Sequence, residues 1–450
     1  STGTGTSSAV IGVSYTASTT SGATVQQNVI HTLAANPNTP ATAVSVVGLA
    51  YSGPTTGTNL VARNFVHSIT SNSTSTGSTL TGIHIANGLT TYQNNMVRMG
   101  INAAGSSITT GYNINGISEA LGTNTVIHNS VYVGGTGVVS VNNTFAFNAQ
   151  QTVNTRTFRN NIFVNDRQNA SGTAVNVAAA YAGTYTGGVT ATGLTLSHNL
   201  YYASTAANTI RNGTTNYTLA AWQPFSGADA GSGVATSVSQ ISFVDATGGS
   251  GTVDLHLTGT TVAEASGTTA TTVTDDYDGT ARSGLTPVDI GADAGNFTAG
   301  TDIFAPVISL SAVSAGVAGT SRTLTGVATI TDNVGVSSGA SAPRLYYKKK
   351  TDNDAFVGNT SADNGWKYVA AANGSSPYDF TVDYTILNGG SVTAGDSIYW
   401  FVAAQDAANN LTSNPFGAGN SGNPPVQNVN SKPTQGAPVP WKVYGISASF

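Results

Sequence analysis

Residues 60–69 read LVARNFVHSI, and related ten-residue stretches recur along the first half of the chain. Each stretch contains one asparagine, and successive asparagines are 31 to 38 residues apart. The residues three positions before and two positions after it are apolar, and the residue just before it is polar. The six asparagines are Asn28, Asn64, Asn95, Asn129, Asn161 and Asn199. A stretch that returns at this period indicates a structural repeat.

A second set of residues repeats in step with the asparagines. Gly12, Gly48, Gly82 and Gly116 lie in apolar runs and are 34 or 36 residues apart. The runs are short, rich in β-branched and aromatic residues, and bounded by Gly, Asn, Ser and Thr, which is typical of strands and turns. One such unit cannot bury its apolar side, but units stacked in parallel can. The repeat therefore predicts a parallel β-solenoid.

The asparagine has a physical reason in such a stack. Equivalent residues of successive coils lie about 4.8 Å apart, so identical amides can bond from coil to coil. We expect each asparagine to adopt the left-handed conformation at a corner. A bend there would also turn both flanking apolar positions inward, although they are an odd number of residues apart.

The composition argues against several classes of protein. Hydrophobic residues make up 39% of the chain and charged residues 8%, and the Val, Ile and aromatic content argues against disorder. No apolar run is long enough to predict a membrane span. The chain has no cysteine, which excludes disulfides and thiol chemistry. A net charge of −5, with no lysine before Lys348, argues against nucleic-acid binding. The first residue is Ser1 rather than Met, which indicates a processed or excised piece.

The repeats fade after Asn199 and are followed by a Trp222 segment, by FVD and DLHL at 243–257, and by DDYDGTARSGLTPVDIGADAG at 275–295. Together with the asparagine-anchored repeats, these motifs resemble secreted right-handed parallel β-helix proteins of the pectate-lyase-like superfamily. The resemblance is to large surface proteins of Bacteroidetes-type bacteria in particular, and it covers residues 10–297. It implies a three-sheet right-handed coil and export by type IX secretion.

A second domain is expected after a linker at 298–305, so that the β-helix with its closing segment spans 1–297 and the second domain 306–450. Lysines appear there, and longer alternating strands recur every 12 to 20 residues, which predicts an antiparallel sandwich. The ITDNVGV and VAAQDAANNLTS segments are similar to bacterial immunoglobulin-like modules. The fold class expected is all-β, a right-handed parallel β-helix followed by an immunoglobulin-like β-sandwich.

Catalytic machinery is not evident in the repeats. Polysaccharide lyases and hydrolases need clustered carboxylates. Before residue 240 the chain has only Glu119, Asp166 and Asp229 as acidic residues. Glu119 and Asp166 are 47 residues apart, which does not match a whole number of coils. We therefore predict that the protein is not an enzyme.

Several residues are candidates for metal binding or modification. Asp275, Asp276 and Asp278 are candidate calcium ligands, the alternative being a turn in which Asp278 pairs with Arg282. No other cofactor is expected. Ser397, in the triplet Asp396-Ser397-Ile398, resembles the O-glycosylation acceptor pattern of Bacteroidetes-type bacteria; a plain turn is the alternative. Among the histidines, His31 and His67 should stack one coil apart, and His128 and His198 are expected to be solvated or at corners.

These observations predict a non-enzymatic extracellular structural protein, a surface adhesin or filament subunit, that is secreted or displayed at the cell surface. The alternative is a polysaccharide-degrading or glycan-binding β-helix protein, with Tyr132, Tyr201 and Tyr202 as exposed aromatics for a glycan. The nine residues STGTGTSSA before Val10 are too polar to cap the first coil. We expect that coil to be covered by self-association or by a continuation of the parent chain.

Overall fold

The computed structural model describes residues 9–17, 22–139, 141–185, 193–285, 288–354, 356–415 and 442–448. The protein is nearly all β, with 45% of its residues in strands and 6% in helices. Two compact units are present: residues 1–184, 191–219 and 232–301 form the first, and residues 185–190, 220–231 and 302–450 the second. The division at 301/302 falls within the expected linker.

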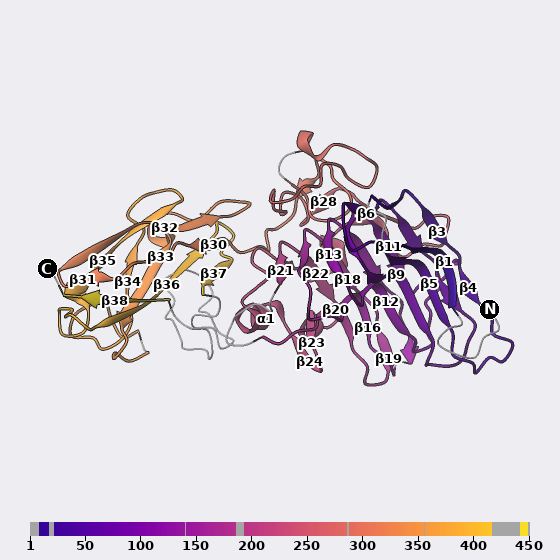
Figure 1. The fold of residues 1–450 in the computed structure, drawn as a ribbon, viewed down its shortest axis with the longest axis horizontal. Coiled ribbons are helices and arrows are strands. Elements are labelled where there is room, and N and C mark those ends of the chain that lie inside the picture. The colour runs from indigo at the N-terminus through magenta and orange to yellow at the C-terminus, as the bar shows by residue number, and fades with distance from the viewer. Residues whose placement is uncertain are drawn as a thin grey trace. The chain divides into compact units, whose positions relative to one another are not determined.

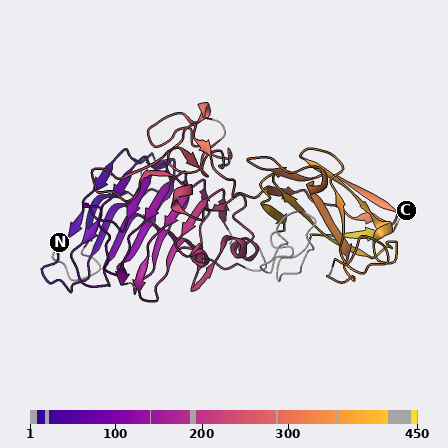
Figure 2. The ribbon, with the colours of Figure 1, turned by 180° about the vertical axis from the view of Figure 1, so that it is seen from behind.

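The first unit is the predicted parallel β-solenoid, with about 8 turns (Figures 1 and 2). Each coil contributes strands to three sheets. Sheet 1 contains β1 (Ala9–Thr16), β5 (Ser45–Ser52), β9 (Thr79–Asn87), β12 (Asn113–Glu119), β16 (Thr144–Ala149), β20 (Asn176–Tyr181) and β23 (Ile210–Asn212), and ends with the antiparallel β24 (Thr215–Tyr217). Sheet 2 contains β2 (Thr24–Gln26), β6 (Asn59–Ala62), β10 (Leu89–Gln93), β13 (Thr123–Ile127), β17 (Arg156–Arg159) and β21 (Leu194–Ser197). Sheet 3 contains β3 (Val29–His31), β7 (Phe65–His67), β11 (Met96–Met99), β14 (Ser130–Val133), β18 (Ile162–Asn165), β22 (Leu200–Ala203) and β25 (Gly233–Val234).

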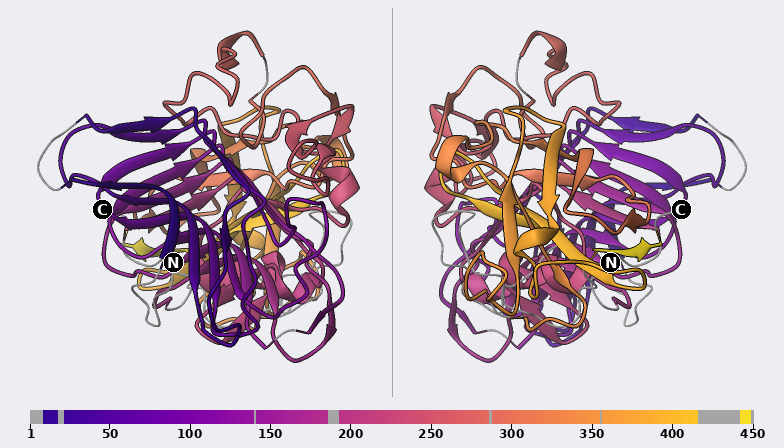
Figure 3. Two further views of the ribbon diagram at one scale, coloured as in Figure 1. Left: turned by 90° about the vertical axis from the view of Figure 1, so that its right-hand side faces the viewer. Right: turned by 90° about the vertical axis from the view of Figure 1, so that its left-hand side faces the viewer.

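The repeated asparagines lie at the bend between sheets 2 and 3. The bend turns the apolar positions on both sides of the asparagine inward, as we expected from the odd number of residues between them. Val61 in β6 and Val66 in β7, for example, both have no exposed surface. The first coils can be followed from the N-terminal side in Figure 3.

The left-handed conformation, however, belongs to the residue before each asparagine, and the prediction that the asparagine adopts it is wrong. From Asn28 to Asn161, each asparagine instead uses both its backbone N–H and its side-chain amide to bind the asparagine of the next coil. We call these preceding residues the corner column. They are Gln27, Arg63, Asn94, His128, Asn160 and His198, with φ of 52–59°.

The asparagine side chains form the predicted hydrogen-bonded ladder. Each Nδ2 donates to the Oδ1 of the asparagine in the next coil: from Asn64 to Asn95 and from Asn95 to Asn129 at 2.9 Å, and from Asn129 to Asn161 at 3.0 Å. The ladder extends one coil further than the sequence indicated, since the Asn199 backbone N–H donates to Ser232 Oγ at 2.8 Å.

The repeated glycines also have a steric reason. They lie in the interior of sheet 1, where a Cβ on Gly116 would be 2.3 Å from Val131 Cγ1 and 2.5 Å from the Ala146 carbonyl oxygen. Gly48 and Gly82 would clash in the same way with Val66 and Val97, respectively. The lack of space for a Cβ atom therefore explains why glycine recurs at this position of sheet 1.

Smaller elements complete the first part of the chain. Two pairs of short parallel strands extend the coils, β4 (Ala34–Ala35) with β8 (Thr70–Ser71) and β15 (Val138–Val139) with β19 (Asn169–Ser171). β26 (Phe243–Asp245) and β27 (Asp254–Leu257) are antiparallel, and β28 (Thr260–Thr261) pairs with β29 (Thr298–Ala299). Among the described residues α1 (Leu219–Ser226) is the one α-helix. No described helix has the length and apolar character needed to cross a membrane.

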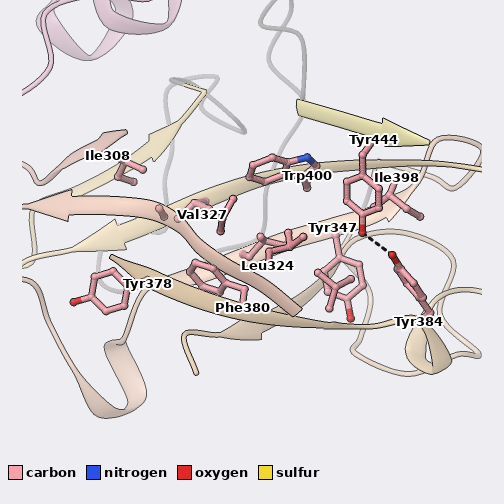
Figure 4. Packing of buried hydrophobic residues seen from close by; sticks show 14 of the residues in the cluster. Ile308, Leu324, Val327, Tyr347, Tyr378, Phe380, Tyr384, Ile398, Trp400 and Tyr444 are labelled. Atoms are coloured by element: carbon pink, nitrogen blue, oxygen red, sulfur yellow. Dashed lines mark hydrogen bonds between the residues drawn. The ribbon is translucent and has the colours of Figure 1, made fainter. Parts of the chain in front are cut away.

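The second unit is the two-sheet arrangement that the strand spacing predicted. One sheet contains β30 (Val307–Leu310), β32 (Ser321–Thr331) and β35 (Tyr378–Asp383). The other contains β31 (Gly316–Val317), β38 (Lys442–Ser447), β36 (Ser397–Gln405), β33 (Arg344–Lys349) and β34 (Lys367–Ala370), with β37 (Leu411–Asn414) paired to β36. Residues of both sheets form one core, in which Phe380 and Trp400 are buried and the Tyr384 and Tyr444 hydroxyls are 3.1 Å apart (Figure 4).

Candidate functional site: the closing segment and its carboxylates

The corner column fastens a later part of the chain to the solenoid. We call residues 254–299, which include β27 to β29, the closing segment. Arg63 Nε donates to the Tyr277 carbonyl oxygen at 2.8 Å. Asn160 exchanges two hydrogen bonds with the backbone of Thr268, at 2.9 and 3.0 Å. The polar residues of this column therefore have a structural role, because the left-handed turn presents them to the closing segment.

The three candidate calcium ligands lie in the closing segment but have separate partners. Asp275 Oδ2 is 3.5 Å from Arg63 Nη1. Asp276 is buried, and its Oδ1 accepts a hydrogen bond from the Thr280 backbone N–H at 2.7 Å. Asp278 is exposed. Asp275, Asp276 and Asp278 do not together form one of the described groups whose ligand atoms converge within 4.8 Å.

The alternative considered from the sequence was a pair between Asp278 and Arg282, but each of these residues has other partners. Asp278 Oδ2 lies 3.1 Å from His256 Nε2. Arg282 is buried, and its Nη2 donates to the Gly291 carbonyl oxygen at 2.9 Å and to Asn94 Oδ1 at 3.2 Å. Burial lowers the pKa of Arg282 to about 10. Arg282 thus ties the closing segment to the corner column.

A cluster that the sequence did not indicate lies beside Asp278. One ligand atom each of His256, Asp278 and Asp293 lies within 4.8 Å of the other two. On the other side of the imidazole, His256 Nδ1 is 2.5 Å from Asp254 Oδ1. The one available signal was the triplet Asp254-Leu-His256, because alternation in a strand places its first and third side chains on one face.

The charges in this cluster shift its proton equilibria. Burial alone would lower the pKa of His256, but the hydrogen bond to Asp254 and the charges of Asp254, Asp293 and Asp278 outweigh it, so this pKa is raised. Burial, with smaller contributions from Asp276 and Asp278, raises the pKa of Asp293 to about 6. The surrounding carboxylates therefore favour the protonated form of the His256 imidazole.

The same donor set fits a metal ion. One imidazole and two carboxylates are ligands that zinc accepts in open sites, and a carboxylate on the second ring nitrogen orients the imidazole. His256, Asp278 and Asp293 would be the ligands, and Asp254 would hold the ring. This set is different from the all-oxygen calcium site predicted for Asp275, Asp276 and Asp278.

Two of the three acidic residues before residue 240, Glu119 and Asp229, are buried. Glu119 has no exposed surface; it accepts hydrogen bonds from Asn124 and Gln151 at 2.8 Å and lies 3.4 Å from Arg156. Burial, which these partners oppose, raises the pKa of Glu119. Asp229 is also fully buried. These acids are therefore not displayed on a groove.

The histidines follow the predicted stack in part. The rings of His31 and His67 are stacked at 5.0 Å. His128 lies at a corner, as expected, but it is fully buried rather than solvated. Burial and then the charge of Arg282 lower the pKa of His128, and burial and the charge of Arg159 lower that of His198 to about 4. Both histidines are therefore neutral in the folded protein at pH 7.

Of the three tyrosines expected to be exposed, only Tyr202 reaches the surface, and the prediction is wrong for Tyr132 and Tyr201, which are buried in the coil. Tyr202 lines a polar cavity of about 420 Å³ in the first unit. Asp166 contacts the Tyr132 hydroxyl at 3.1 Å, and also bonds to Tyr202. The rest of the cavity is lined by Gln168, Asn169, Ala174, Asn176, Ser204, Thr205 and Asn208.

The candidate glycosylation site is at the start of a strand in the second unit. Ser397 is the first residue of β36 and is half-buried, and its carbonyl oxygen accepts a hydrogen bond from the Lys350 backbone N–H at 2.8 Å. The preceding Asp396 accepts from Thr393 N–H at 2.8 Å. The triplet is therefore a turn that leads into a strand, and glycosylation of Ser397 stays a prediction.

No known family model matches this chain, and comparisons with curated proteins and with solved structures found no significant similarity.

Proposed function

We propose that this protein is a non-enzymatic extracellular structural protein, a surface adhesin or filament subunit, secreted or displayed at the cell surface. What supports the proposal is that the solenoid uses its charges internally. Glu119 is bound to Arg156, and the buried Arg98 and Arg167 donate to backbone carbonyl oxygens at 2.6 Å. Charges committed to holding coils together favour a scaffold over acid–base catalysis. The resemblance to exported β-helix surface proteins with immunoglobulin-like stalks points the same way.

Surface display is tested on cells that produce the protein naturally. Intact cells are treated with a protease that does not enter them, and the chain is followed with an antibody, alongside a cytoplasmic control protein. We expect the chain to be cleaved or found in the medium while the control stays intact. Protection in intact cells, with cleavage only after lysis, would contradict the proposal.

The enzyme alternative is tested with uronate polymers and neutral polysaccharides, with and without calcium. We expect no chain cleavage. If cleavage occurs, Asp293→Asn decides whether the closing-segment cluster performs it, because Asp293 has the raised pKa that a general acid needs. Cleavage by the wild type that Asp293→Asn abolishes would replace the structural proposal with an enzymatic one.

Glycan binding at the Tyr202 cavity is a second candidate function. The cavity is lined by one aromatic ring with several amides and hydroxyls, which are groups that bind sugar rings and hydroxyls. We expect a glycan array to give binding that Tyr202→Ala abolishes and Tyr202→Phe retains, because phenylalanine keeps the ring. Equal binding by wild type and Tyr202→Ala would exclude this cavity as the glycan site.

A further inference from the structure

Three aspartates from distant parts of the sequence meet in the second unit. Asp302 precedes β30, Asp332 directly follows β32, and Asp406 directly follows β36. One carboxylate oxygen of each lies within 4.8 Å of the other two. The fold therefore gathers three negative charges at one end of the sandwich, although the residues are 30 and 74 positions apart.

The surrounding contacts hold each carboxylate in place. Asp406 has no exposed surface, and its Oδ1 and Oδ2 accept from the backbone N–H and the side-chain amide of Asn410 at 2.9 and 2.8 Å. The same Asn410 amide donates to Asp302 Oδ2 at 3.1 Å, and Asn333 Nδ2 donates to Asp302 Oδ1 at 3.0 Å. Asp332 Oδ1 accepts from two backbone N–H groups at 3.0 and 2.8 Å.

One oxygen in this arrangement has no partner among the residues that the structure describes. Asp332 Oδ2 is buried and accepts no hydrogen bond from any of them, although the residue as a whole is part-exposed. Leaving a buried charged oxygen unpaired is unfavourable, so such an atom normally indicates a missing partner.

The cluster also lacks a positive charge. None of the ion pairs formed by the described residues involves Asp302, Asp332 or Asp406. The Asn410 amide is shared between two carboxylates, and an uncharged amide cannot neutralise either of them. Burial, and then the hydrogen bond with Asp302, raises the pKa of Asp406 to about 6.

We infer that Asp302, Asp332 and Asp406 bind a calcium ion. Calcium takes six to eight oxygen ligands, including carboxylates, amide oxygens and water. The three carboxylates supply oxygen donors, and the unpartnered Asp332 Oδ2 is a ready ligand. The set contains no histidine or cysteine, which argues against zinc and other soft metals. The ion would fasten the chain that precedes β30 to the ends of β32 and β36.

The inference is tested on the full chain by calorimetry, with titration of Ca²⁺ into EDTA-treated protein and thermal unfolding in 5 mM CaCl₂ or in EDTA. For an affinity in the range of extracellular calcium modules, we expect the transition of the second unit to rise by roughly 5 °C in calcium. Asp332→Asn keeps the shape of the side chain and removes its charge. We expect it to lose most of the calcium response and to unfold in EDTA at the wild-type temperature or above.

Two further variants distinguish this site from other acidic groups. Asp363→Asn changes a part-exposed aspartate of the same unit that accepts a hydrogen bond from the Thr360 N–H, and Asp278→Asn changes the closing segment. Both should keep the calcium response of the second unit. The inference is overturned if calcium leaves that transition unchanged, if Asp332→Asn responds as the wild type does, or if 5 mM MgCl₂ gives the same shift.

Discussion

Asn129 shows how much one side chain does in this fold. Its Oδ1 accepts from both the backbone N–H and the side-chain amide of Asn95, at 3.0 and 2.9 Å, and its own amide donates to Asn161 and to the Tyr92 carbonyl oxygen. The residue is fully buried. The donors and acceptors that it contacts in Asn95, Asn161 and Tyr92 therefore depend on this amide, because no water is available as a substitute.

We predict that Asn129→Ala destabilises the solenoid by about 3 kcal/mol or more, because two donors of Asn95 lose their acceptor in a buried place. Asn28→Ala is the matched control. It removes the same side chain at the part-exposed end of the ladder, where water can replace it, and should have less than half the effect. Urea unfolding followed by circular dichroism measures both. Equal losses would contradict the structural importance of the ladder.

The corner histidines make a prediction about pH. Because the folded pKa of His198 is lowered to about 4, the unfolded chain binds a proton between pH 6.5 and 4 while the folded chain does not. Stability from this residue is therefore complete above pH 6.5 and falls as the pH is lowered, by about 2 kcal/mol at pH 5. His128 acts in the same direction.

His198→Asn and His128→Asn should flatten this acid dependence, since asparagine occupies the same column at Asn94 and Asn160 and does not titrate. The measurement is the free energy of unfolding at pH 7 and at pH 5 for each variant and the wild type. Comparing the pH difference within each protein removes any constant effect of the substitution. An unchanged difference would show that these histidines are not the acid-sensitive groups.

At the scale of the strand, packing across the coil controls the choice of residue. In sheet 1 the glycine column faces the valines of sheet 3, and the column continues as Ala146 and Ala178 where Phe163 and Tyr201 take the place of valine. The residue in sheet 1 and the residue opposite it in sheet 3 therefore change together from coil to coil.

Gly116→Ala should destabilise the solenoid by about 2 kcal/mol, because the new Cβ would overlap Val131 Cγ1 and the carbonyl oxygen of Ala146. In the double variant with Val131→Ala, the combined loss should be smaller than the sum of the two single losses, since one clash is removed. Thermal unfolding of the three variants measures the coupling. Strict additivity would show that the two positions do not meet.

The elements of the solenoid could be predicted because their signal is repeated. The asparagine and glycine registers fixed the stack and the positions of the strands, since the same local physics applies in every coil. The final coil escaped notice because Ser232 takes the place of asparagine there. The left-handed turn was assigned one residue late because the sequence does not show which of two polar neighbours bends the backbone.

The candidate sites were less predictable because they depend on contacts between distant residues. Asp275, Asp276 and Asp278 are adjacent in sequence, yet they have different partners. The groups that converge come from separate strands and loops, as with His256 and Asp293. Only the three-dimensional path of the chain brings such residues together, and no local pattern encodes it.

At the scale of the molecule, the first coil is the place where stacking is incomplete. Within the described residues, sheets 1, 2 and 3 end at β1, β2 and β3, and each of these strands has a partner on one side only. Ile11 is 41% exposed and Val29 is 59% exposed on this coil. We propose that a second copy of the protein covers it, which is the self-association considered from the sequence.

Self-association predicts a mass that increases with concentration in light scattering after size-exclusion chromatography. The double variant Ile11→Lys with Val29→Lys should stay monomeric, because lysine ammonium groups resist burial in a contact. Val153→Lys changes a more exposed valine elsewhere and should associate as the wild type does. A wild-type mass that stays monomeric at every concentration would rule out a second copy as the cover.

The asparagine ladder also has a polarity. From Asn28 to Asn161, each side-chain amide donates one hydrogen bond to the Oδ1 of the asparagine in the next coil, so the bonds between these side chains all run in one direction along the stack. A copy added to the first coil in the same orientation would direct donors at Asn28 Oδ1, whereas a two-fold pair would set acceptor against acceptor. An assembly that extended this ladder would therefore be a vectorial, open-ended polymer, with two chemically different tips, rather than a closed symmetric dimer.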